Sequence, residues 1–303
     1  MNKIIIVGCS NVGMAYAQNL VLRDINIDEL ALIDLNEERI EGEVIDLQHS
    51  LSFTNNYIKI KKGDYKEDCK DARIVVICAG RNQKKGETRQ ELIDSNIKII
   101  DNIIDSCAQN NFNGIYIIVS NPVDVLTLHA YKKLGIGKAK VFGSGTSLDT
   151  ARLQYAIGRE LNINPKYINA YVLGEHGDSE MVAWSSASVA NIPIKNFLNK
   201  DDMQRIEDEV RNSAYEIINK KGFTNYGVGS AVFAITYAIL SNEKYILPVS
   251  TYDEKNDVCY SRPASIGKNG IDRVFDLDLS KEDAKKLKKS IEFLKKTKDN
   301  LGI

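Results

Sequence analysis

Short β-rich runs alternate with longer amphipathic stretches over the first 145 residues, and this alternation limits the possible folds more than any other feature of the chain. The β-rich runs are IIIV, ALID, RIVVICAG, GIYIIVS and KVFGSG, and the amphipathic stretches between them are 12–22, 37–50, 90–109 and 123–134. A strand, a helix and a second strand in succession form a βαβ unit with parallel strands. Because such crossovers are right-handed, successive units cover both faces of one sheet. The sequence therefore predicts the α/β class with a doubly wound parallel sheet.

After about residue 145 the pattern changes to longer helical stretches, which are 147–161, 202–221, 228–241 and 281–300. Four apolar segments between them predict the strands of a smaller mixed sheet: NAYVLGEHGD, AWSSASVANIPI, YILPVSTYD and CYSRPASIG. The change predicts a first domain over residues 1–142 and a mixed α+β second domain over 143–303, without a flexible linker. A chain of 303 residues is long for one core, so two lobes with a cleft between them are expected.

Charge and cysteine content exclude several classes of partner. Forty basic residues balance forty-one acidic ones, and the one polybasic run, KKLKKSIEFLKK, has the periodicity of a solvated helix face. Nucleic acid and membrane surfaces are therefore not expected partners. No run approaches the roughly 18 consecutive apolar residues of a membrane span. Five scattered cysteines without metal-type spacing indicate the reducing cytoplasm; they are Cys9, Cys69, Cys78, Cys107 and Cys259.

A glycine-containing turn, GCSNVG, lies between the first predicted strand and the helix that begins near Val12. Gly8 and Gly13 occupy the outer positions of the pattern G-x-G-x-x-G. Gly8 permits the tight turn and Gly13 lets the helix pack closely on the strand, so that the helix N-terminus is directed at a pyrophosphate. The middle position is Ser10, whose hydroxymethyl group crowds the approach of phosphate. Alone, the turn fits either a dinucleotide site or a plain connection.

Asp34 ends the second predicted strand, twenty-one residues after Gly13. An acid in this place accepts hydrogen bonds from the adenosine ribose hydroxyls and repels a 2′-phosphate. With the turn, it predicts a Rossmann-type nucleotide site and favours NAD over NADP. In the alternative interpretation Asp34 caps the helix predicted over 36–48, and the two roles are compatible.

Seven motifs follow one another along almost the entire chain: GCSNVG, LALIDLN, GETRQEL, SNPVDVLT, GSGTSLDTARL, GEHGD and KGFTNYGVG. In this order they resemble the lactate/malate dehydrogenase family, and seven collinear motifs are far more specific than any single one. The resemblance implies an NAD-binding Rossmann domain over 1–142, a substrate-binding and catalytic domain over 143–303, and reversible reduction of pyruvate to L-lactate. It also implies a homotetramer, with a dimer as the alternative, and no metal.

The same resemblance implies two sets of binding residues. The expected contacts to NAD are Gly8, Val12, Gly13, Asp34, Arg39, Tyr65, Gly80, Asn102, Val119 and Ser144. The expected contacts to the substrate are Arg152, Asn121, Gln83 and Thr224.

His176, in GEHGD, is the candidate acid/base. Imidazole titrates near neutral pH, so it can donate a proton to a ketone oxygen and recover it from an alcohol. The flanking glycines are expected to let the backbone turn so that the ring faces a cleft. A lone histidine is more often structural, but the resemblance implies that Asp149 supplies the carboxylate that fixes its tautomer and favours the protonated form. His49 and His129 lie in helical patterns and are expected to be structural.

Arg152 follows Asp149 by three residues in LDTAR, so a helix there places the two on one face. Its guanidinium can bind a substrate carboxylate through two parallel hydrogen bonds. Asn121, in SNPVD, follows a predicted parallel strand, at the edge where such sheets bind ligands, and its amide can support the carbonyl oxygen. The alternatives are a surface arginine and a turn residue before Pro122.

The polar segment AGRNQKKGETRQEL resembles the loop that closes over the substrate in this family. Arg89 would then polarise the carbonyl once closure excludes water. Alone, such a segment is more often a surface connection. Malate enzymes have an arginine at the position of Gln83, because oxaloacetate carries a second carboxylate. Neutral Gln83 leaves that charge unpaired, which favours pyruvate. The alternatives are a branched 2-hydroxy acid such as 2-hydroxyisocaproate, malate, and a nucleotide-binding protein without turnover.

Two further positions concern regulation. Many bacterial relatives bind fructose 1,6-bisphosphate through an arginine two positions after the substrate-binding arginine and a histidine seven before the catalytic one. Here these positions hold Gln154 and Asn169. Neither side chain can be cationic, so the sequence predicts insensitivity to this sugar phosphate. In the alternative interpretation, other lysines or arginines nearby bind the phosphates.

Overall fold

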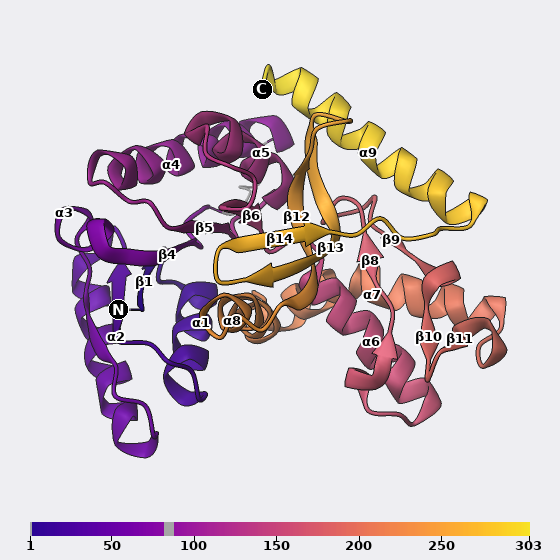
Figure 1. Ribbon diagram of the computed structural model, residues 1–303, viewed down its shortest axis with the longest axis horizontal. Helices are drawn as coiled ribbons and strands as arrows, with labels where there is room; N and C mark the ends of the chain where they lie inside the picture. Colours follow the sequence, from indigo (N-terminus) through magenta and orange to yellow (C-terminus); the bar gives the residue numbers. More distant parts are fainter. Residues whose placement is uncertain (1, 82–87) are drawn as a thin grey trace.

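The central sheet of the computed structural model, which describes residues 2–81 and 88–303, has nine strands in the order β14-β13-β12-β6-β5-β4-β1-β2-β3 (Figure 1). These strands are β1 (Lys3–Val7), β2 (Glu29–Ile33), β3 (Lys59–Lys62), β4 (Ala72–Ile77), β5 (Ile115–Ile118), β6 (Val141–Gly143), β12 (Tyr245–Asp253), β13 (Val258–Gly267) and β14 (Gly270–Val274). The helices are α1 (Asn11–Leu22), α2 (Glu37–Ser50), α3 (Tyr65–Asp68), α4 (Arg89–Gln109), α5 (Val123–Leu134), α6 (Ser147–Leu161), α7 (Lys200–Lys221), α8 (Tyr226–Leu240) and α9 (Lys281–Leu301).

The six strands from β3 to β6 are parallel, in the order β3-β2-β1-β4-β5-β6. The predicted doubly wound sheet is therefore confirmed. The chain order reverses between β1 and β4, and ligands of such sheets bind in the crevice that opens there at the carboxyl ends of the strands.

Two apolar cores lie on opposite faces of this sheet because side chains alternate along each strand. One face carries Ile4 and Ile6 of β1 against α1, α2 and α8. The other carries Ile5 and Val7 against α4 and α5. Each β-rich run is thus apolar on both faces, as expected of a strand buried between two layers of helices. Figure 1 shows α8, from the second half of the chain, beside α1.

Side-chain caps fix the starts of two helices that flank the crevice. Asn36 caps α2 by accepting from the Arg39 backbone N–H, so the alternative role of Asp34 as that cap was wrong. Thr88 and Glu91 form a capping box that begins α4. The start of α4 is therefore fixed shortly after residues 82–87, which lie outside the described residues and make up six of the fourteen residues of the segment predicted to close over the substrate.

The second half of the chain departs from the predicted separate mixed sheet. The segments YILPVSTYD and CYSRPASIG form β12 and β13, an antiparallel pair that extends the large sheet where Ser250 pairs with Gly143 of β6. Only the other two segments form small sheets, which contain β7 (Ile168–Asn169), β8 (Val172–Leu173), β9 (Met181–Val182), β10 (Ser188–Val189) and β11 (Ile192–Pro193). The prediction for β12 and β13 was wrong because alternation within a strand does not encode the edge with which it pairs.

Across the two described ranges, every helix is too short or too polar to cross a membrane.

Candidate active site

A cavity of about 570 Å³ opens at the carboxyl ends of β1, β2 and β4. Five of the residues predicted to contact NAD line it: Gly8, Asp34, Tyr65, Gly80 and Asn102. Its volume falls within the range of small-molecule and cofactor sites, and its place is the crevice at which doubly wound sheets bind nucleotides.

The turn beneath this cavity requires glycine. Gly8 has a φ of +93°, and a Cβ at this position would lie 2.3 Å from the backbone nitrogen of Ala79. A Cβ on Gly13 would lie 2.1 Å from the Gly8 carbonyl oxygen, so α1 packs against the turn as the motif predicts. The side chain of Ser10 makes no capping bond, which leaves backbone N–H groups of the first turn of α1 for an anion.

Asp34 lies half-buried at the end of β2, on the wall of the same cavity. Its carboxylate accepts from the backbone N–H groups of Cys9 at 2.7 Å and Asn36 at 3.0 Å. These bonds orient the carboxylate, and its remaining lone pairs can accept from ribose hydroxyls. The sequence reasoning missed Arg81, which lines the cavity and offers a cation for phosphate. An arginine directly after Gly80 was the available signal. The site therefore fits a dinucleotide.

The other five residues predicted to contact NAD do not line this cavity. Arg39 pairs with Glu43 and lines a neighbouring hollow of about 310 Å³, which shares Ser10 with the first cavity. Val12 and Val119 pack against the apolar core, Gly13 is buried, and Ser144 follows β6. Their contacts to NAD stay predictions.

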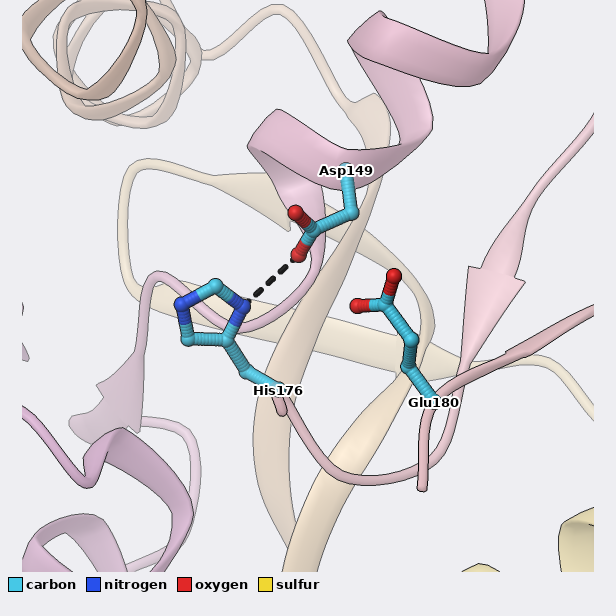
Figure 2. Close-up of side chains that lie close together, drawn as sticks. All are labelled: Asp149, His176 and Glu180. Carbon is cyan, nitrogen blue, oxygen red and sulfur yellow. Dashed lines mark hydrogen bonds and ion pairs between the residues drawn. The ribbon is translucent and has the colours of Figure 1, made fainter. Parts of the chain in front are cut away.

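His176 and Asp149 form the candidate acid/base pair (Figure 2). His176 Nδ1 lies 2.7 Å from Asp149 Oδ2, so the second ring nitrogen, Nε2, is left for a substrate. The histidine side chain keeps 26 % of its surface exposed, whereas that of Asp149 keeps 3 %. The preceding Gly174 has a φ of +89°, but Gly177 has no positive φ, so only one of the flanking glycines has the expected conformational role.

Burial and charge act in opposite directions on this pair. Burial alone would lower the pKa of His176, but the Asp149 carboxylate outweighs it and raises this pKa to about 9. Burial would raise the pKa of Asp149, but His176 and Arg152 hold it below its ordinary range. At neutral pH the pair is therefore an imidazolium and a carboxylate, the state in which the ring can give up a proton.

Arg152 is held by the same carboxylate. Its Nη1 donates to Asp149 Oδ1 at 2.7 Å, and its side chain keeps 15 % of its surface exposed. One aspartate on α6 thus positions both an acid/base and a guanidinium that can bind a carboxylate. The predicted i, i+3 placement on one helix face is confirmed.

Two further acids near His176 were missed by the sequence reasoning. Asp124, buried in α5, accepts from the His176 backbone N–H at 2.7 Å and from the Ser250 hydroxyl at 2.6 Å. Burial raises the pKa of Asp124 to about 6. Glu180 directs its carboxyl towards Asp149 (Figure 2). An acid inside the apolar pattern VDVLTL was the available signal for Asp124, and Glu180 had none beyond its distance of four residues from His176.

The other predicted site residues are placed less completely. Asn121 is exposed beyond the end of β5, and its carbonyl accepts from Asn96. Thr224 lies half-buried between α7 and α8. Arg89 is the first residue of α4, and Gln83 lies outside the described residues. The roles of these four residues stay predictions.

Asp149, His176 and Glu180 each offer one possible metal ligand, and these three atoms lie within 4.8 Å of one another. Both oxygens of Asp149 already accept hydrogen bonds, one of them from the Arg152 cation, which would repel a metal ion. The arrangement suits proton transfer better than metal binding, and the expectation of no metal stays a prediction.

The fold and this acid/base pair define a dinucleotide-dependent oxidoreductase. Residues 2–143 match the family model for the lactate/malate dehydrogenase NAD binding domain, and residues 146–301 match that for the lactate/malate dehydrogenase alpha/beta C-terminal domain. The chain belongs to the lactate/malate dehydrogenase family, and NAD is its cofactor.

Relatives agree over nearly the full length. An L-lactate dehydrogenase of Halalkalibacterium halodurans is 45% identical and aligns over 97% of this chain and 96% of its own. One from Corynebacterium efficiens is 41% identical, with 99% and 97% covered. A solved lactate dehydrogenase from a Medee basin deep-sea metagenome library superposes with a TM-score of 0.96 at 42% identity, with 100% and 99% covered.

Proposed function

We propose that this chain catalyses the reversible reduction of pyruvate to L-lactate, with His176 as acid/base. The observation that carries the proposal is the 2.7 Å bond between His176 Nδ1 and a buried Asp149 that also holds Arg152. In this proposal residues 1–142 bind NAD, and residues 143–303 bind the substrate and carry the acid/base. When bound, the nicotinamide supplies or accepts the hydride.

In this proposal His176 moves the proton. Asp149 holds the ring by its Nδ1 side, so Nε2 delivers a proton to the ketone oxygen during reduction and takes it back during oxidation. The imidazolium is stabilised by a carboxylate that is buried and therefore little screened by water. Proton delivery needs protonated His176, so reduction should decline as the pH rises through about 9, and oxidation should rise over the same range.

Arg152 orients the substrate by its carboxylate through charge-assisted hydrogen bonds. Asp149 accepts from the same guanidinium, so the Arg152 side chain is already positioned by a buried partner. Asn121 and Arg89 support and polarise the carbonyl oxygen, and Thr224 contacts the substrate. These three roles follow from the family resemblance and from the positions of these residues at the end of β5, the start of α4 and the α7–α8 connection.

A substrate panel with NADH tests the proposal. Pyruvate, oxaloacetate, 2-oxobutyrate and 2-oxoisocaproate are compared by kcat/KM, and pyruvate should exceed oxaloacetate by at least about 100-fold because Gln83 leaves a second carboxylate unpaired. Gln83→Arg should move the ratio towards oxaloacetate. Preference for 2-oxoisocaproate or oxaloacetate in the wild type would make this one of the alternative 2-hydroxy acid dehydrogenases, and NADH binding without turnover would refute an enzyme.

We further propose that the enzyme is cytoplasmic. We expect it to assemble as a homotetramer, with a dimer as the alternative. All five cysteines are free thiols, as expected in a reducing compartment. Exposed aromatic side chains, among them Phe53 at 90 % and Tyr57 at 99 %, fit burial against other subunits. Light scattering after gel filtration measures the assembly, and a monomer would contradict it.

A further inference from the structure

Glu180 is a third ionisable group next to the acid/base pair, and the reaction outlined above does not use it. We propose that Glu180 is a positioning residue whose carboxyl controls the charge state of the Asp149–His176 pair and thereby sets the pH range in which His176 carries its proton. The inference deepens the proposed function and rests on it for its catalytic consequence, but the contact it concerns can be measured without substrate.

The geometry places this carboxyl against the pair. One oxygen of Glu180, one of Asp149 and a ring nitrogen of His176 all lie within 4.8 Å of one another. In Figure 2 the Glu180 carboxyl lies beside that of Asp149. The imidazole lies on the other side of the dashed hydrogen bond between His176 and Asp149. An ionised Glu180 carboxyl at this distance stabilises the imidazolium of His176. It also disfavours the ionised form of Asp149, because the two carboxylates repel each other.

Glu180 is 91 % buried, yet its carboxyl has no hydrogen bond or ion pair to any residue that the structure describes. A buried carboxyl usually accepts hydrogen bonds from a donor or pairs with a cation, and otherwise it stays protonated. The matched case is Glu207 on α7, which is equally buried but accepts from Trp184 and Arg211. Glu180 thus lies directly beside the acid/base pair without a described donor to its carboxyl, although neither of its oxygens is fully buried.

Charged groups on α5, α6 and α7 act on the ionisation of Glu180 and His176. Burial and the Asp149 carboxylate raise the pKa of Glu180 to about 8, while His176, Arg152 on α6 and Arg211 on α7 act to lower it. Asp124 on α5 adds a further negative charge facing His176.

The charge on Glu180 affects how firmly His176 holds its proton. Near neutral pH, Glu180 is protonated and the pair consists of the imidazolium and the Asp149 carboxylate. As the pH rises, ionisation of the Glu180 carboxyl adds a negative charge beside the ring, and this charge favours the protonated form of His176. Glu180 therefore extends pyruvate reduction to higher pH and delays the onset of lactate oxidation.

Direct titration of His176 tests this. The chain has only three histidines, so the imidazole carbon-bound proton signals can be followed by NMR in the intact, substrate-free protein, and His176→Asn assigns the signal that matters. Glu180→Gln keeps the shape of the protonated acid and removes its charge. It should lower the pKa of His176 by about one unit, the lower end of the effect of an opposite charge at this distance.

Two control variants separate charge from packing. Glu207→Gln also removes a buried glutamate but should leave the pKa of His176 unchanged, because the carboxylates that act on the ring are those of Asp149, Glu180 and Asp124. Glu180→Asp keeps the negative charge, but its side chain is one methylene shorter and holds the charge further from the ring. The pKa of His176 in this variant should therefore lie between the values in wild type and in Glu180→Gln. If Glu180→Gln does not fold, wild type and Glu180→Asp decide alone, since equal His176 pKa values in these two would overturn the inference.

The catalytic consequence is measured as the pH profile of kcat/KM for pyruvate, whose alkaline limb should move down with the pKa of His176 in Glu180→Gln. An unmoved His176 pKa in a folded Glu180→Gln variant would overturn the inference and leave the proposed function intact. A wild type that does not reduce pyruvate would overturn the proposed function, while the titration would still decide whether Glu180 acts on His176.

Discussion

The nucleotide cavity and the acid/base cluster belong to one enzyme but are built in different ways. The cavity is formed mainly by backbone: strand ends, a glycine turn and the start of α1, with Asp34 held by two backbone N–H groups. The cluster is formed by buried charges from α5, α6 and the segment after β8. Shape should therefore control cofactor binding, and charge should control turnover.

Loss of the imidazole gives the largest expected effect and tests this separation directly. His176→Asn should cut kcat by about 10²–10⁴-fold, the usual contribution of a general acid. NADH affinity, measured by fluorescence titration, should stay within about twofold, because the cavity does not use this side chain. His129→Asn is the matched control, since His129 pairs with Asp101 on α4 and is expected to be structural. Near-normal turnover of His176→Asn would remove His176 from the mechanism.

The converse experiment breaks the cavity. Gly8→Ala should weaken NADH binding by about 10–100-fold, because the strained φ costs roughly 1–3 kcal/mol and the added Cβ meets Ala79. Gly135→Ala is the control: its φ is +60° and a Cβ would have open space, so it should lower thermal stability without changing NADH affinity. Equal NADH affinities for Gly8→Ala and wild type would show that the turn does not shape the cavity.

A smaller effect is expected from Asp124, which holds the backbone of His176 and not its ring. Asp124→Asn should lower kcat by about tenfold, since one charge-assisted hydrogen bond is replaced by a neutral one. Its effect on stability has a definite sign. Burial raises the pKa of Asp124 to about 6, above the ordinary value of about 3.9 in the unfolded chain, so the wild type loses stability as the pH rises from about 4 to 6.

Asn does not titrate, so the melting temperature of Asp124→Asn relative to wild type should increase between pH 4 and pH 7. Differential scanning calorimetry at both pH values measures it. A difference that is constant with pH would mean that burial does not raise the pKa of Asp124 above its value in the unfolded chain. Ser250→Ala, which removes the other hydrogen bond to the carboxyl, should act on stability with less effect on turnover.

The nucleotide cavity depends on local sequence signals, whereas the acid/base cluster depends on tertiary packing, and this difference decides which features the sequence could predict. The four long helices of the first half were predicted to within a residue or two, because apolar periodicity and the glycine turn are local signals, whereas the short α3 was not predicted. The strand KIKK was not recognised, since an edge strand rich in lysine lacks an apolar run. Asp149 and Arg152 were placed together by helical spacing.

Long-range neighbours carry no such local signal. Nothing in the spacing of Asp124 or Glu180 predicts that both lie next to His176, because α5, α6 and the segment after β8 meet only through tertiary packing. The pairing of β12 with β6 is of the same kind. The family resemblance supplied Asp149 as a partner of His176, and the unassigned acids around them needed the structure.

The smallest expected effect concerns fructose 1,6-bisphosphate, which should change the apparent KM for pyruvate by less than about twofold. Gln154 and Asn169 line a cavity of about 470 Å³ whose one cationic side chain among the described residues is Lys166. Gln154 faces the carbonyl of Ala170 at 3.4 Å. Two phosphates need several charge-assisted hydrogen bonds, and an effector shifts an equilibrium only by its differential affinity for the two states. Pyruvate saturation curves with and without millimolar effector near neutral pH measure this. A several-fold drop in KM would show that Lys166 or its neighbours bind the phosphates, and loss of that drop in Lys166→Gln would identify the residue.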